Sequence, residues 1–229
     1  YGKRQRGNQL RSDLRHLQSR YRKEGAVMAD WLENLVNKDY LQDNLTFASL
    51  FIALYENMTD YVVSSVRDFL CDIGIRDGKM FCEETDDYRR EIRKRVVDNK
   101  GNLDTTKASF LWLIDNRAIT SADFDRFLQI KQVRNKYAHK LSEVITTGIA
   151  ESEVALLFDM HSLYRKISGW FFVEIEASII GYDVPPDADI SNIQSGANVM
   201  FSIILNVLYN GKSKEYQSII ASIKEKHEV

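Results

Sequence analysis

The sequence predicts an all-α fold, a bundle of helices in a single domain, from the scarcity of helix breakers and from its apolar spacing. The 229 residues include only two prolines, adjacent at Pro185 and Pro186, and 11 glycines, so few positions interrupt a helix. We expect no strands, because no window alternates strictly between apolar and polar residues and apolar residues recur at helical spacing throughout. Because 44% of the residues are hydrophobic, the chain can bury a substantial core.

Start and stop signals divide this periodicity into individual helices. Ser121 and the acidic pair Glu151 and Glu153 mark helix starts, whereas Gly101 and Gly148 mark stops. A broad apolar stripe makes the second helix a central bundle element. We expect helices at 9–37, 45–72, 86–99, 105–115, 121–145, 151–181, 191–209 and 213–226.

The expected domain covers 1–229, with a core bundle at 45–181 and further helices at 191–229. Its first part, 1–37, is a basic helical extension. Residues 1–24 hold eight Lys or Arg and two acids, a net charge of +6, which leaves −8 for the rest. A basic arm on an acidic body is typical of a nucleic-acid contact, although a solvated helix face or a disordered tail has the same composition.

Several classes of protein are excluded by the residue counts. Two cysteines are too few for a disulfide framework, and four scattered histidines do not form a zinc pattern, so we expect no metal and no cofactor. The uncharged segment 190–211 contains five Asn or Gln residues, so we interpret it as a core helix and not as a membrane span. The N-terminus lacks the apolar run of a signal peptide, and we expect a cytoplasmic protein.

One segment, 127–141, carries residues suited to chemistry. On a helix with 100° per residue, Arg134 falls within the apolar stripe, while Asn135 and His139 stack on its flank. An arginine at that position needs a negative partner, because burying an unpaired charge is unfavourable. The partner is either a carboxylate from a neighbouring helix or the phosphate of a ligand. The expected stripe comprises Phe127, Ile130, Tyr137, Ala138, Leu141 and Ile145.

The run from Arg134 to His139, Arg-Asn-Lys-Tyr-Ala-His, resembles the R-x(4–6)-H motif of the HEPN superfamily in its RN-x-x-x-H form. The resemblance in residues is confined to about 121–145, and elsewhere it concerns only the helical layout. It implies an all-α HEPN-like bundle and, as in many members, a metal-independent endoribonuclease. Such proteins are typically homodimers with a composite active site. Many act as toxins or in abortive infection and other antiviral defence, often opposed by an antitoxin or another regulatory protein.

The resemblance makes Arg134 and His139 the catalytic pair and Asn135 a supporting residue. Metal-independent cleavage of RNA uses the 2′-OH as an internal nucleophile, giving 2′,3′-cyclic phosphate and 5′-OH ends. Histidine suits the proton transfer, and the arginine fork suits the phosphate charge. Because one histidine per chain is few for two proton steps, a symmetric dimer is expected.

Several lysines and aromatic or histidine residues outside the catalytic pair can be assigned either a functional or a purely structural role. Lys131, Lys136 and Lys140 either bind the RNA backbone or are ordinary solvated lysines. Tyr137 can stack on a base, but its place on the apolar stripe favours core packing. His161 is more consistent with a hydrogen-bonded core histidine than with a second catalytic group.

Three hypotheses for function follow. The leading one is a HEPN-type ribonuclease. The alternative is a non-catalytic HEPN-like module that binds RNA, a nucleotide or a protein partner. The third is an unrelated helical interaction protein in which Arg134 is only a structural ion-pair partner.

Overall fold

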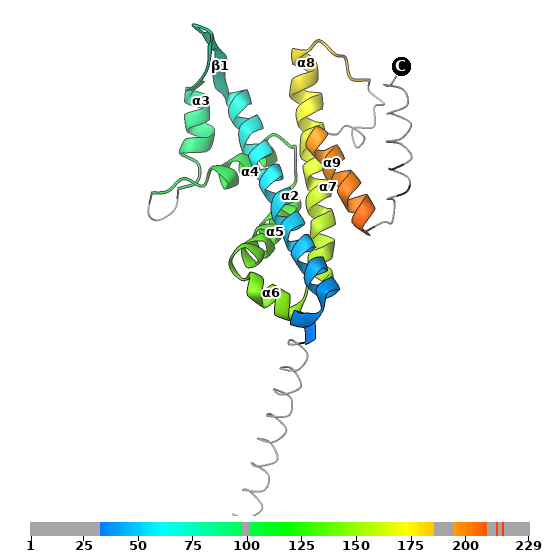
Figure 1. Cartoon of the computed structure of the whole chain (residues 1–229). Helices are drawn as coiled ribbons and strands as arrows, with labels where there is room; N and C mark the ends of the chain where they lie inside the picture. Colours follow the sequence, from blue (N-terminus) through cyan, green and yellow to red (C-terminus); the bar gives the residue numbers. More distant parts are fainter. Residues whose placement is uncertain (1–32, 98–100, 186–194, 210–213, 215–216, 218–229) are drawn as a thin grey trace, which may run out of the picture.

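The computed structural model describes residues 33–97, 101–185, 195–209, 214 and 217 (Figure 1). Most of the predicted basic extension 1–37 therefore lies outside the described residues, as does nearly all of the predicted helix 213–226. Within the described part the chain is mostly α-helical, which confirms the predicted fold class.

The centre of the fold is the long helix α2 (Lys38–Leu70), which α4, α5 and α7 all contact (Figure 1). It begins seven residues before the predicted start, because Asn37 caps it by accepting a hydrogen bond from the Tyr40 amide at 3.1 Å. The predicted stripe is buried along most of its length, but Phe69, near its end, is 51% exposed.

Four more helices complete the bundle around α2. They are α4 (Thr105–Asp115), α5 (Ser121–His139), α7 (Glu151–Phe171) and α9 (Gly196–Tyr209). A π-helical segment, η2 (Phe172–Glu176), and the short α8 (Ala177–Ile179) continue α7, and α9 packs against α7 (Figure 1). Aromatic rings fill the core; those buried include Phe47, Phe51, Phe110, Phe127, Tyr137, Tyr164 and Phe171.

A β-hairpin at the end of α2 is the exception to the all-α prediction. Strands β1 (Cys71–Arg76) and β2 (Lys79–Glu84) pair antiparallel, and Asp77 and Gly78 form the turn with φ of 53° and 74°. Positive φ at both central turn residues fits the twist of a two-residue hairpin, for which Asp-Gly is a favoured sequence. Apolar residues alternate with Asp, Gly and Arg over 71–76, so the prediction that no window alternates is wrong for this segment.

Two predicted helices are interrupted. The helix expected at 86–99 ends at Arg93, as α3 (Asp86–Tyr88) followed by the π-helical η1 (Arg89–Arg93). The helix expected at 121–145 breaks at Lys140, whose φ of −132° and ψ of 37° leave the helical region, and α6 (Leu141–Thr147) follows. The predicted apolar stripe is buried only as far as Tyr137, because Ala138, still within α5, and Leu141, after the break, are both exposed.

The segment predicted as a core helix at 191–209 is described from Ser195 onward, and α9 buries Asn198, Phe201 and Leu205. Among the described residues, no helix is both long enough and apolar enough to span a membrane.

Candidate functional site

The helix that carries the motif, α5, has a well-defined start and a fixed rotation in the bundle. Thr120 and Asp123 form a reciprocal capping box, with the Thr120 hydroxyl accepting from the Asp123 amide at 3.2 Å. Phe127, Ile130 and Tyr137 are buried on the core side. These anchors set which residues of α5 reach the surface near its C-terminal end.

Arg134 is held by a carboxylate from α2. Its Nε donates to Glu56 Oε1 at 2.8 Å, and its Nη2 donates to the same oxygen. Nη1 donates to Asn135 Oδ1 at 3.1 Å, and the guanidinium carbon lies 5.5 Å from the centre of the Tyr55 ring. Of the two partners considered for Arg134, a neighbouring carboxylate and a ligand phosphate, the structure contains the first.

The guanidinium of Arg134 nevertheless keeps donor capacity. It carries five N–H groups, and the three hydrogen bonds to Glu56 and Asn135 leave two without a partner among the described residues. The side chain is 28% exposed. Glu56 and Tyr55 therefore orient this arginine at the surface, with its remaining N–H groups available to an oxygen ligand.

Asn135 and His139 lie on the exposed side of α5, four residues apart on one face. Asn135 is tied to Arg134 through its side-chain oxygen. His139 is the last residue of α5, just before the break at Lys140, and its ring is exposed. The three motif residues thus lie at one exposed end of α5, with Arg134 and His139 offset by about 140° around its axis.

The predicted RNA-binding lysines all lie near carboxylates. Lys131 Nζ is 3.4 Å from Asp104, Lys136 Nζ is 2.8 Å from Glu153, and Lys140 Nζ is 3.6 Å from Glu143. These contacts differ in exposure: Lys140 is 64% exposed in its side chain, whereas Glu153 is nearly buried. Lys140 is the lysine of this group that is most accessible to an RNA backbone.

Lys136 and Tyr137 together hold the buried carboxylate of Glu153. One oxygen accepts from Lys136, and the other accepts from the Tyr137 hydroxyl at 2.8 Å and from the Ala150 amide at 3.3 Å. Burial alone raises the pKa of Glu153, but these hydrogen bonds outweigh it and hold that pKa below its ordinary value. Burial and the Glu153 charge raise the pKa of Tyr137, which is only 1% exposed, so core packing is confirmed for this residue.

His161, the other histidine considered, lies between α7 and α9. Its Nε2 is 3.0 Å from Ser202 Oγ and 3.5 Å from the Asn198 carbonyl oxygen. Burial lowers the pKa of this imidazole and favours its neutral form. The structure therefore confirms a hydrogen-bonded histidine packed between α7 and α9.

The contacts of two carboxylates that organise this region could not be predicted from the sequence. Glu56 lies 78 positions before Arg134, and Glu153 lies 16 positions after Tyr137. No local pattern connects residues so far apart, because the contacts depend on how α2 and α7 pack on α5. Among the described residues, no three His, Cys, Asp or Glu side chains group as metal ligands.

Comparison with models of known protein families found no match, and neither curated proteins nor solved structures matched this chain. The HEPN resemblance therefore stays a prediction that depends on the motif and its helical context.

Proposed function

We propose that this protein is a metal-independent endoribonuclease of the HEPN type that acts as a homodimer. The observation that carries the proposal is the setting of Arg134, which Glu56 and Asn135 orient at the surface with two N–H groups remaining. Such a guanidinium can receive two phosphate oxygens, and the exposed His139 lies on the same helical end.

In the proposed reaction the 2′-oxygen of a ribose attacks the adjacent phosphorus and the bond to the 5′-oxygen breaks. One imidazole accepts the 2′-OH proton, and a second group donates a proton to the leaving 5′-oxygen. Arg134 stabilises the negative charge on the non-bridging oxygens of the pentacoordinate phosphorus. His139 fills one proton role in each chain, and His139 of a second copy fills the other across a two-fold axis.

A non-catalytic module that binds RNA, a nucleotide or a protein partner is the second candidate. It is favoured by the carboxylates beside the site, since Arg134 pairs with Glu56 and Lys136 with Glu153. Each pairing lowers the positive potential that an RNA backbone would meet. The same Glu56 contact supports the third hypothesis, in which Arg134 serves only to join α2 and α5.

A role as a cytoplasmic toxin or anti-phage effector, restrained by an antitoxin or other regulatory protein, belongs to the same proposal. It is carried by the HEPN resemblance alone.

The test is cleavage of a mixed RNA by the full chain in EDTA, with product ends analysed for 2′,3′-cyclic phosphate. We expect His139→Ala and Arg134→Ala to lower the rate by about 100-fold or more, the scale of a lost proton-transfer group or charge stabiliser. Arg126→Ala is the matched control. It removes an arginine from the same helix together with an ion pair, because Arg126 Nε lies 2.7 Å from Asp159 on α7.

Each hypothesis has its own outcome. Cleavage that survives in folded His139→Ala would reject the proposed site. A wild-type chain that binds RNA without cutting it, and binds less in Arg134→Ala than in Arg126→Ala, would establish the binding module instead. A chain that neither binds nor cuts RNA, and that unfolds in Arg134→Ala, would leave only the structural ion pair.

A further inference from the structure

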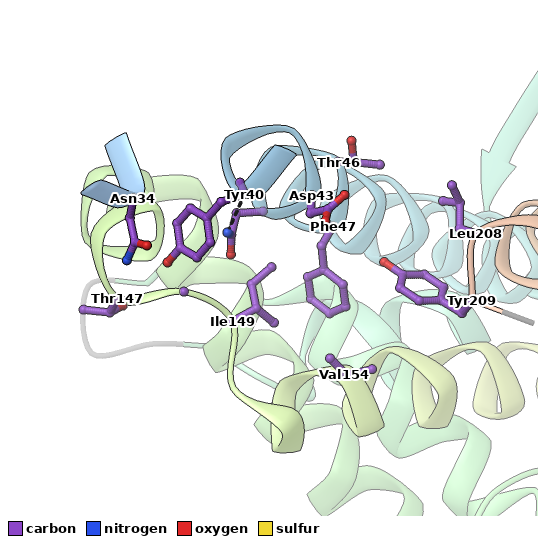
Figure 2. Close-up of a pocket in the computed structure, with 12 residues that line it drawn as sticks. Asn34, Tyr40, Asp43, Thr46, Phe47, Thr147, Ile149, Val154, Leu208 and Tyr209 are labelled. Carbon is purple, nitrogen blue, oxygen red and sulfur yellow. Dashed lines mark hydrogen bonds between the residues drawn. The ribbon is translucent and has the colours of Figure 1, made fainter. Parts of the chain in front are cut away.

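A cavity of about 630 Å³ lies between the first turns of α2, the loop from α6 to α7 and the end of α9, and its lining includes none of Arg134, Asn135 and His139 (Figure 2). This volume falls within the range of about 300–1,000 Å³ that is usual for small-molecule sites. Its walls come from three separate parts of the chain, which the bundle brings together.

Three aromatic residues line the cavity, together with polar and aliphatic side chains. Figure 2 shows the rings of Tyr40 and Phe47 extending from α2 toward Ile149, while Tyr209 approaches from α9. The Phe47 and Tyr209 rings pack edge to face, with centroids 6.3 Å apart. Phe47 is 3% exposed, so this side of the cavity continues directly into the core.

The loop of the cavity is shaped by Gly148. Its φ of 78° lies in the left-handed region, and a Cβ at this position would lie only 2.9 Å from the Tyr40 hydroxyl. Glycine therefore allows the Tyr40 side chain to lie close against the loop, where its ring faces the cavity.

The charge on the residues that line the cavity is negative. Among the described residues that line the cavity, Asp43 carries the charge at neutral pH, and no Lys, Arg or His is present. The Asp43 carboxylate also acts on the aromatic wall, since burial and then the charge of Asp43 raise the pKa of Tyr209. An anionic ligand would meet repulsion here, whereas a cation would meet the Asp43 carboxylate beside the aromatic side chains of Tyr40 and Tyr209.

We propose that this cavity binds a small organic cation, an amine or amidine on an aromatic or aliphatic body. The ammonium or amidinium pairs with Asp43, and the rings of Tyr40, Phe47 and Tyr209 contact the body of the ligand. This site is separate from the RNA site proposed on α5 and does not depend on it.

Three probes of similar size and different charge test the proposal: 2-phenylethylamine, 2-phenylethanol and phenylacetate. Each is titrated into the ¹⁵N-labelled full chain at neutral pH and constant ionic strength, to about 10 mM, and the Gly148 amide signal is followed. We expect saturable shifts with the amine, affinity about fivefold lower with the alcohol, and no saturation with the carboxylate. An amine that does not saturate, or binds no better than the alcohol, overturns the proposal.

Two variants locate the binding. Asp43→Asn should lower amine affinity about fivefold and leave the alcohol unchanged. Asp39→Asn removes the same charge one turn earlier in α2, at an exposed residue that, unlike the equally exposed Asp43, does not line the cavity, and it should have little effect. Thr46→Trp places a large side chain at an exposed edge of the cavity and should abolish saturation while the circular dichroism spectrum stays that of the wild type. Equal losses in Asp39→Asn and Asp43→Asn would mean general surface attraction and would overturn the assignment.

Discussion

The buried carboxylate of Glu153 joins α5 to the start of α7, and its removal should destabilise the fold strongly. The side chain is 10% exposed and accepts hydrogen bonds from Lys136, Tyr137 and the Ala150 amide. In Glu153→Ala the buried Tyr137 hydroxyl loses its acceptor, which costs about 1–3 kcal/mol, and the first turn of α7 loses a capping interaction worth about 1 kcal/mol. Together these losses lower the expected free energy of unfolding by about 2–4 kcal/mol.

Urea denaturation measures this change, and thermal unfolding should show a midpoint about 10 °C lower for a chain of this size. Glu151→Ala is the matched control, because Glu151 is an exposed acid in the same helical turn; it should change stability by less than about 0.5 kcal/mol. In a double-mutant cycle, Tyr137→Phe should reduce the cost of Glu153→Ala by about 1 kcal/mol or more. A cost below about 1 kcal/mol, or no coupling to Tyr137, would refute this account of the network.

Two further predictions concern backbone strain and pH. Arg117 has a φ of 60° just after the end of α4, where glycine is usual. The free energy of unfolding, measured in urea, should therefore be about 0.5–1 kcal/mol higher for Arg117→Gly than for Arg117→Ala. Equal stabilities of the two variants would contradict the backbone strain. Burial lowers the pKa of His161 from its ordinary 6.5, so the unfolded chain binds the proton more readily and stability should fall as pH drops below about 6.5. His161→Gln should flatten the dependence of stability on pH below about 6.5, measured by urea denaturation at a series of pH values. The stability that comes from the lowered pKa values of Asp123 and Glu153 is lost only as the pH falls below their ordinary values of 3.8 and 4.5, so it does not obscure the histidine effect.

Helices whose ends are marked by capping or acidic residues could be predicted from the sequence. Elements whose bounds depend on tertiary packing could not. Helix α4 matches its predicted bounds, and α7 begins at the acidic turn that predicted it. The hairpin was missed although Asp77 and Gly78 are a favoured turn pair, because its strands expose Ile75 and Met80 and lack a clearly buried face. The break at Lys140 could not be predicted, because no glycine or proline lies at or next to this position.

The candidate site shows the same division. The local spacing of Arg134, Asn135 and His139 could be recognised on one helix, and so could the need of Arg134 for a negative partner. Which partner it has could not be recognised, because Glu56 belongs to a helix that meets α5 only in the folded bundle. The same holds for two of the lysines, because the packing of the bundle places Asp104 beside Lys131 and Glu153 beside Lys136.

The two carboxylates act on α5 from different directions, and this bears on how the motif is presented. Glu56 holds Arg134 from α2, while Glu153 holds Lys136 and Tyr137 from α7. Residues 134 and 136 lie about 160° apart around the helix axis, so contacts on both sides oppose rotation of α5 in either direction. A fixed rotation of α5 keeps His139 exposed and holds the Arg134 guanidinium in one orientation. Recognition of a phosphate by a single arginine requires such preorganisation. Loss of Glu153 should therefore disturb the motif as well as the core. The role of the lysines in RNA binding is better tested by substituting Lys140 than Lys136, because a Lys140 variant keeps both the Glu56 and the Glu153 contacts of α5.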